Sequence, residues 1–269
     1  MEYETIRWER DGAVGIVRLH RPERMNAVIE QMYLELLDCL AAAGRDDGVR
    51  VLLLTGSVLR RDGQEKQAFC AGADLKKHDT GERTHAQQRA YIELAHEATR
   101  RIHEFEKPVL AVLNGPARGA GTELALACDF ILIAEEASLA FPETSLGTFV
   151  GGGATSHLPR LVGPARAKEL IYTGRVVDGR EAVALGLATR CFPVARLFDE
   201  ALALARSLAE KAPLSMRFAK RRLQQWPAPD LATVLQLETD AILHCMDTED
   251  WHEGVRAFGE KRKPEFRGV

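Results

Sequence analysis

Two glutamates, Glu123 and Glu143, are the side chains whose types and spacing best suit proton chemistry. Glu123 opens an expected helix, and Glu143 follows a short apolar segment that ends in Phe141-Pro142. Twenty residues separate them, which is room for a helix and a returning strand to bring both to one site. Two carboxyl groups around one water can serve as base and acid if their surroundings separate their pKa values. The alternative is that Glu123 only complements a helix dipole and Glu143 is a solvated loop residue.

Two turns rich in small residues, 70–74 and 114–122, precede expected helices. An unpaired backbone N–H at such a turn stabilises negative charge, and two converging N–H groups form an oxyanion hole. The second turn lacks the third glycine of a dinucleotide motif and the Gly-Lys-Ser/Thr of a phosphate loop, so no nucleotide cofactor is expected. The alternative is that the glycines only serve tight turns.

The sequence predicts neither a metal site nor disulfides. His96-Glu97 and His103-Glu104 each lack the second histidine of a zincin motif. Five cysteines are odd in number, widely spaced and never paired as C-x-x-C, which favours reduced, buried thiols in a cytosol-like compartment. They are Cys39, Cys70, Cys128, Cys191 and Cys245.

The elements that must position these residues alternate in type. Apolar runs predict strands over 13–19, 49–54, 109–113, 130–133 and 138–141. Helical spacing predicts helices over 26–40, 164–171 and 178–186, a long polar helix ending near residue 106, and a helix beginning at Glu123, while 58–66 is expected to be a polar loop. After about residue 195 only helices are expected, over 197–211, 215–225, 231–246 and 251–262. This order predicts an α/β core, residues 1–196, followed by a helical region, residues 197–269.

Length and composition are those of an ordinary globular protein. The chain has 269 residues, of which 46% are hydrophobic and 28% charged, and its net charge is −3. This balance gives no reason to expect nucleic acid or a membrane surface as partner. No apolar run approaches the ~20 residues that cross a bilayer, and the acidic N-terminus is unlike a signal peptide. We therefore expect a cytoplasmic protein.

Taken together, the motifs resemble those of the crotonase, or enoyl-CoA hydratase/isomerase, superfamily. The resemblance runs nearly end to end and rests on several motifs in the right order, which is more specific than any one of them. It is nearest to the enoyl-CoA and 3-methylglutaconyl-CoA hydratases of that superfamily. The matching segments are 21–27, 68–75, 114–121, 123–129, 141–143, 161–170 and 260–264.

The resemblance implies a crotonase-type spiral of ββα repeats with a C-terminal helical trimerisation region, assembled as a trimer or as a hexamer. It implies an enoyl-CoA hydratase, a hydro-lyase of fatty acid metabolism that adds water reversibly to a 2-enoyl-CoA thioester to give a 3-hydroxyacyl-CoA. CoA belongs to the substrate, so no separate cofactor is expected. The alternatives are an isomerase, lyase or hydrolase of the same superfamily, and a non-catalytic or RNA-binding homologue. RNA binding is disfavoured because acidic residues interrupt the basic ones after Asp74 and no aromatic platform accompanies them.

Family positions imply the role of each site residue. Glu123 would help take a proton from water and Glu143 would deliver one to the substrate Cα, while the N–H groups of Ala73 and Ala120 would hold the thioester oxygen. Cys70, beside the first of these amides, is interpreted as a packing residue. The positions implied to contact CoA or substrate are Arg24, Ala27, Ala71, Ala73, Asp74, Leu75, Lys76, Gly119, Gly151, Phe258 and Lys261. The last two would reach the CoA bound to a neighbouring subunit.

Two segments depart from the family pattern. After Glu143, Val150 replaces a usual proline and Ser156-His157 replaces a Gln-Arg pair. Because this loop lies near the acyl group in relatives, the length, branching and charge of the acyl group stay open. His157 is expected to be a surface or interface histidine. The loop 58–67, which is longer than usual, is expected to decorate the rim of the site.

Overall fold

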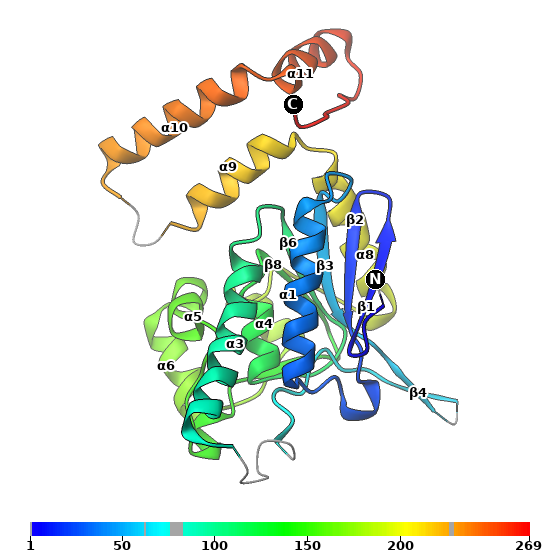
Figure 1. Cartoon of the computed structure of the whole chain (residues 1–269), viewed down its shortest axis with the longest axis vertical. Helices are drawn as coiled ribbons and strands as arrows, with labels where there is room; N and C mark the ends of the chain where they lie inside the picture. The colour runs from blue at the N-terminus through cyan, green and yellow to red at the C-terminus, as the bar shows by residue number, and fades with distance from the viewer. Residues whose placement is uncertain (1, 62, 76–82, 226–228) are drawn as a thin grey trace.

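A six-stranded sheet lies at the centre of the chain, in the order β1-β2-β3-β6-β8-β11 (Figure 1). The structure is a computed structural model, and it describes residues 2–61, 63–75, 83–225 and 229–269. β1 runs antiparallel to β2, and the other neighbours pair in parallel. The strands are β1 (Ile6–Asp11), β2 (Val14–Leu19), β3 (Val51–Gly56), β6 (Val109–Leu113), β8 (Phe130–Ala134) and β11 (Arg190–Phe192). This is the α/β class predicted.

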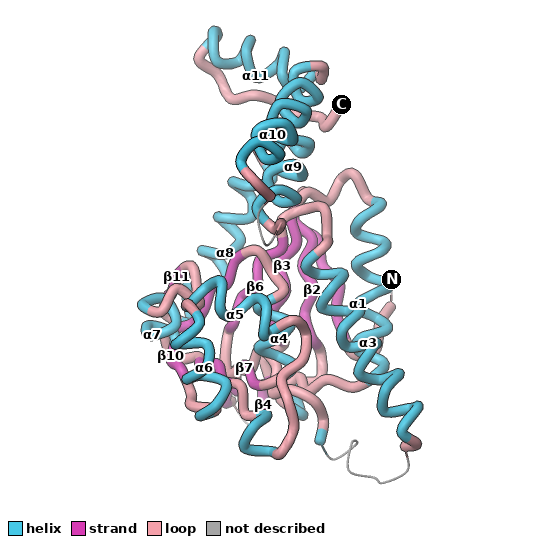
Figure 2. Tube along the Cα trace, turned by 90° about the vertical axis from the view of Figure 1, so that its left-hand side faces the viewer, coloured by secondary structure: helices cyan, strands magenta, loops and turns pink. Residues whose placement is uncertain are grey.

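Helices cover both faces of this sheet, which explains its continuous apolar strands. Every residue of β3 and β6 is buried, as expected for parallel strands between two helical layers. Figure 2 shows α1 (Glu30–Arg45) and α3 (His85–His103) on one side and α8 (Val194–Ala209) on the other. The apolar core therefore lies on both sides of the sheet.

A smaller sheet, in the order β10-β9-β7, carries the elements around the two glutamates. β7 (Ala117–Arg118) leads directly into α4 (Ala120–Leu126), and β9 (Ser138–Ala140) leads into the 3₁₀ turn η2 (Glu143–Leu146). The chain continues through α5 (Ala154–Val162) and α6 (Pro164–Thr173) to β10 (Val177–Asp178) and α7 (Gly179–Ala184).

The last three helices, α9 (Pro213–Leu223), α10 (Leu231–Met246) and α11 (Glu249–Glu260), project from the body (Figures 1 and 2). A buried lysine ties α9 to the core, because Lys220 Nζ donates to Asp129 at 2.8 Å and to the Lys107 carbonyl at 3.0 Å. The division expected after residue 196 remains a prediction, and it falls inside α8, which packs on the sheet. None of the helices in the described ranges is long and apolar enough to cross a membrane.

Several element boundaries differ from those predicted. The first helix begins at Glu30 rather than residue 26, because Val28 is extended and forms a bridge with Ala73. The helix expected to begin at Glu123 begins three residues earlier, at Ala120. The predicted loop 58–66 contains a small hairpin, β4 (Leu59–Arg61) and β5 (Gln64–Lys66). β1, β11 and α5 were not predicted.

Candidate active site

The small sheet brings Glu143 back to the start of α4. β7 pairs in parallel with β9, and the Gly119 amide donates to the Ala140 carbonyl at 3.2 Å. Three residues later, Glu143 Oε1 lies 2.7 Å from the point where a Cβ on Gly119 would stand. The Glu123 amide donates to the Gly119 carbonyl at 2.9 Å. Both glutamates are thus brought together at the first turn of α4, as predicted.

Position 119 needs glycine for two reasons. Its φ is +48°, in a region that favours glycine, and a Cβ would stand 2.7 Å from Oε1 of Glu143, so that the carboxylate would have to move. Gly119 was predicted to touch substrate, and the structure places it directly against a catalytic candidate. Its missing side chain is what allows Glu143 to lie against the backbone of α4.

Burial gives both carboxyl groups a raised proton affinity. The pKa of Glu123 is raised to about 7, chiefly by burial and further by the charge of Glu143, while a hydrogen bond from the Gly151 amide opposes the rise. That amide donates to Glu123 Oε1 at 2.6 Å. Burial also raises the pKa of Glu143, whose buried Oε2 has no hydrogen-bond partner among the described residues. Near neutral pH, Glu123 can therefore both accept and release a proton.

The two amides predicted as oxyanion donors lie close together and have no hydrogen-bond acceptor among the described residues. Two hydrogen bonds join this turn to Val28: the Val28 amide donates to the Gly72 carbonyl at 2.8 Å, and the Asp74 amide donates to the Val28 carbonyl at 3.0 Å. Neither of them uses the N–H of Ala73, which lies between Gly72 and Asp74. Ala120 is the first residue of α4, where an N–H has no partner within its helix. Among the described residues neither amide has a hydrogen-bond acceptor. A Cβ on Gly72 would stand 3.8 Å from the Ala120 nitrogen, which shows how closely the two turns approach.

A buried asparagine fixes the first of these turns. Asn26 Nδ2 donates to the carbonyls of Ser57 and Ala68, both at 2.9 Å, and its Oδ1 accepts from the Arg21 amide at 3.0 Å. The Arg21 guanidinium also pairs with Asp74 at 2.9 Å, with both side chains nearly buried. The carboxylate of Asp74, predicted to contact substrate, is therefore held by the protein itself.

The other residues predicted to hold CoA near this turn differ in exposure. Arg24 and Leu75 are exposed, whereas Ala27 is buried. The Ala71 amide donates to the Met25 carbonyl at 3.0 Å, which fixes the segments beside each other. Lys76 lies outside the described residues.

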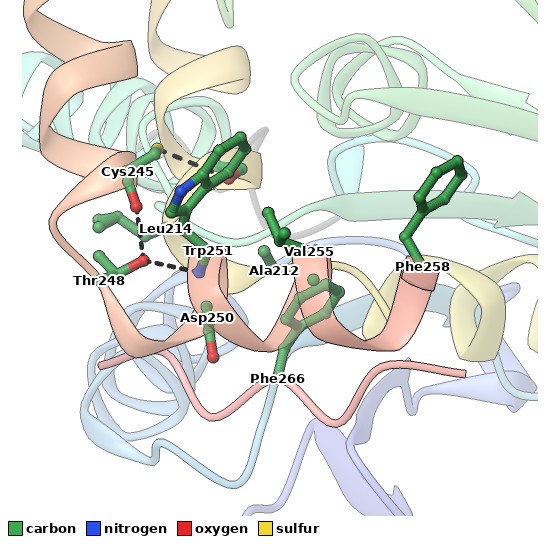
Figure 3. Close-up of a pocket in the computed structure, with 11 residues that line it drawn as sticks. Ala212, Leu214, Cys245, Thr248, Asp250, Trp251, Val255, Phe258 and Phe266 are labelled. Carbon is green, nitrogen blue, oxygen red and sulfur yellow. Dashed lines mark hydrogen bonds between the residues drawn. The ribbon is translucent and has the colours of Figure 1, made fainter. Parts of the chain in front are cut away.

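Phe258 and Lys261 are not brought to the glutamates within one chain. They lie at the end of α11, in the projecting layer, and the Phe258 side chain is 88% exposed. Figure 3 shows Trp251, Val255 and Phe258 along one face of α11, and these side chains help to line a cavity of about 370 Å³ between α9, α10, α11 and the C-terminal segment. Thr248 fixes the corner, since its Oγ1 accepts from the Trp251 amide at 3.2 Å and donates to the Cys245 carbonyl at 2.6 Å.

Two further expectations concern cysteine and histidine. Cys70 is fully buried and burial raises its pKa to about 12, which agrees with a packing role rather than a nucleophile. The ring of His157, expected at a surface or an interface, is partly buried and lies 4.7 Å from the ring of His103, and that expectation stays a prediction. Burial and the neighbouring His103 lower its pKa to about 4. Within the described ranges, no group of three or more metal-ligating side chains gathers.

The contacts of the loop after η2 were missed by sequence reasoning, apart from Gly151. Gly152 and Gly153 have φ of +55° and +77°, and a Cβ on Gly152 would stand 2.7 Å from the Cβ of Glu123. The run of three glycines was the available signal. His96 of α3 also contacts this loop, and no motif marked it.

Comparisons with known proteins agree with this geometry. The family described as Enoyl-CoA hydratase/isomerase matches residues 9–269. A crotonyl-CoA hydratase of Syntrophomonas wolfei is 36% identical over 99% of both chains. A short-chain-enoyl-CoA hydratase of Clostridium acetobutylicum is 32% identical over 98% of both. A crystal structure of an enoyl-CoA hydratase from Bacillus anthracis superposes with a TM-score of 0.92 at 37% identity, covering 99% of this chain and all of the other.

Proposed function

The chain belongs to the enoyl-CoA hydratase/isomerase family, and we propose that it is an enoyl-CoA hydratase in which Glu123 and Glu143 act on one water. It adds that water reversibly to the double bond of a 2-enoyl-CoA thioester and forms a 3-hydroxyacyl-CoA. One observation carries the assignment of residues: two buried carboxyl groups of raised pKa meet at the first turn of α4, beside two amides that have no acceptor among the described residues.

The backbone amides of Ala73 and Ala120 activate the thioester for attack by water. A conjugated thioester is a poor electrophile until the negative charge that develops on its oxygen is stabilised. Two amides held by surrounding backbone bonds donate to that oxygen without having to reorganise during the reaction. The loss of one such donor typically costs about 10²–10³ in rate.

The glutamates divide the proton transfers. Glu123, ionised, takes a proton from water as the oxygen bonds to Cβ, and Glu143, protonated, gives a proton to Cα of the enolate. The Gly151 amide supports this division, because its hydrogen bond favours an ionised Glu123, whereas the buried Oε2 of Glu143 has no such donor among the described residues. After the step Glu123 holds the proton and Glu143 is ionised, so a proton returns to Glu143 before the next turnover.

The CoA part of the substrate lies along the first turn in this proposal, near Arg24, Ala27 and the segment from Ala71 to Lys76. CoA arrives with the acyl group, so the reaction uses no separate cofactor and no metal. The odd number and wide spacing of the five cysteines support a reducing, cytoplasmic setting.

Self-association involves the projecting layer. Helices α9 to α11 expose apolar side chains that a second copy of the chain would cover, and the family typically oligomerises. The exposed set includes Leu223, Leu231, Leu235, Ile242, Leu243, Trp251, Val255 and Phe258. We expect a trimer or a dimer of trimers, in which Phe258 and Lys261 reach the CoA of a neighbouring subunit.

The activity is tested by adding the purified protein to a panel of 2-enoyl-CoAs and following the loss of the conjugated-thioester absorbance. The panel contains crotonyl-, a medium straight-chain, 3-methylcrotonyl- and 3-methylglutaconyl-CoA. Glu123→Gln and Glu143→Gln should each lower kcat by about 10²–10⁴, with much less effect on CoA binding. Near-normal hydration by either variant contradicts the paired-glutamate mechanism. If the natural protein hydrates no member of the panel, the hydratase assignment is wrong and isomerase or lyase chemistry takes its place.

The assembly is tested separately by light scattering. Val255→Asp, in the middle of the apolar face of α11, should shift the protein to a smaller species. His252→Asp, an exposed polar position on the same helix, is the matched control and should leave the mass unchanged. A natural protein that is monomeric at micromolar concentration contradicts the proposed assembly.

A further inference from the structure

Arg118 is a partly buried arginine at the end of β7, two residues before the Ala120 amide. Its Nη1 donates to the Ser138 carbonyl at 2.9 Å and to the Ala117 carbonyl at 2.8 Å. Its Nη2 donates to Ser138 Oγ at 2.9 Å. The guanidinium thus reaches from β7 to the first residue of β9, the strand that leads to Glu143.

Arg118 has no acidic partner among the described residues, and burial lowers its pKa. A guanidinium withdrawn from water without a carboxylate beside it depends on its hydrogen bonds to offset the loss of hydration. In the described part of the chain, the bonds of its side chain all go to residues of β7 and β9. The cation therefore stabilises chiefly the pairing of these two strands.

This strand pair is very short, which gives the side-chain bonds their weight. β7 has two residues and β9 has three, so the ladder between them offers few main-chain hydrogen bonds. Just beyond β7, the Gly119 amide donates to the Ala140 carbonyl at 3.2 Å. Hydrogen bonds from a charged donor are stronger than those from a neutral amide, and Arg118 adds such bonds at the other end of the pair, at Ser138.

Two groups of the proposed site follow the two strands that Arg118 joins. The Ala120 amide, a proposed oxyanion donor, follows β7 after a single residue, Gly119. Glu143, the proposed acid, lies three residues after the end of β9. Its Oε1 is 2.7 Å from the point where a Cβ on Gly119 would stand. Any widening between β7 and β9 would therefore move the acid away from the amide that holds the thioester oxygen.

We propose that Arg118 is a positioning residue for hydration, which holds β9 against β7 and so keeps the Glu143 carboxyl where it can deliver a proton to Cα of a thioester bound at the Ala120 amide. This rests on the proposed function, since it takes Glu143 as the acid. In this role Arg118 acts through Glu143 and not on the substrate itself.

The test compares Arg118→Met, which removes every side-chain donor, with Arg118→Lys, which keeps a charged one. Hydration of crotonyl-CoA is measured well below the unfolding temperature of each variant. In Arg118→Met, kcat should fall about 10–100-fold while KM changes less than about 3-fold, because a displacement of about 1 Å at a reacting group can cost about 10² in rate. Arg118→Lys should recover part of the loss. Arg206→Met removes an arginine that joins α8 to Asp11 of β1, and as the control it should leave kcat unchanged.

A double-mutant comparison separates positioning from general support of the fold. If Arg118 acts through Glu143, then Arg118→Met should lower kcat by less than about 3-fold in a protein that already carries Glu143→Gln. An equal loss in both backgrounds would overturn the proposal. So would an Arg118→Met variant that is less stable than the natural protein but keeps its kcat, because the arginine would then only support the fold.

Hydrogen exchange adds a measurement that needs no turnover. It follows the Gly119 amide, whose bond to the Ala140 carbonyl crosses from the end of β7 to β9. Exchange in Arg118→Met should be about 10-fold faster or more than in the natural protein. Ser138→Ala, a milder change that removes the bond to Oγ, should give smaller changes in the same direction in both exchange and kcat. Unchanged exchange in Arg118→Met overturns the proposal even if the natural protein proves to catalyse another reaction.

Discussion

Replacing Glu123 by glutamine is expected to stabilise the folded protein while it removes activity. Burial raises the pKa of Glu123 from 4.5 to about 7, so the folded chain keeps a proton that the unfolded chain has already released. Between those two values the folded state binds more protons than the unfolded state, and stability falls as pH rises; above about pH 7 the loss is complete. At about 1.4 kcal/mol for each unit of pKa, the shift corresponds to about 3 kcal/mol.

Glu123→Gln removes this ionisation and keeps an oxygen that can accept the Gly151 amide. The variant should be about 3 kcal/mol more stable than the natural protein at pH 8 and nearly equal to it at pH 4.5. Urea unfolding at both pH values measures this, with protein concentrations matched because association shifts apparent stability. Glu106→Gln, at a side chain that is 65% exposed, should change stability by less than about 0.5 kcal/mol at either pH. A difference that does not vary with pH, or a variant that is less stable at pH 8, would refute the reasoning.

Three further outcomes are expected. Gly152→Ala should lower the free energy of unfolding by about 2 kcal/mol or more, because φ is +55° and the new Cβ would stand 2.7 Å from the Cβ of Glu123. Gly63→Ala, at φ +73° with open space around it, should lower it by about 1 kcal/mol. Urea unfolding midpoints compare the two variants. Arg21→Ala should cost about 3 kcal/mol in the same assay, since it removes a nearly buried guanidinium that pairs with Asp74 at 2.9 Å and donates to the Ala27 carbonyl, and a loss under about 1 kcal/mol would contradict that role. Cys70 should resist iodoacetamide at pH 8 until the protein unfolds, because burial raises its pKa to about 12; mass spectrometry of its peptide detects early labelling, which would show the thiol to be accessible.

The central strands were predictable because parallel strands buried on both faces are continuous apolar runs. β1 was missed for the opposite reason: it is an edge strand, and of its six residues only Ile6 is fully buried. α5 was missed because it follows three glycines and contains Pro159, both of which obscure a helical pattern. The helix expected from residue 26 begins later because bridging to Ala73 keeps Val28 extended, a long-range contact that local spacing cannot reveal.

The site divides in the same way. The meeting of Glu123 and Glu143 could be predicted because their separation allows one helix and one returning strand. The contact of the Glu143 carboxylate with Gly119 could not be predicted, because it depends on the pairing of two very short strands, β7 and β9. The position of His96 depends on how α3 packs across a loop more than fifty residues away, and no local pattern encodes that packing.

The side-chain amide of Asn26 holds the first oxyanion turn in place, and this makes the protein sensitive to deamidation of that residue. Asn26 is fully buried, and its amide nitrogen supplies both hydrogen bonds that hold the carbonyls of Ser57 and Ala68. Deamidation would exchange that nitrogen for oxygen, so that an ionised carboxylate would face two carbonyl oxygens in a buried site. The fold that buries this amide therefore also protects the active site, and protein that deamidates while this turn is open would not close again unchanged.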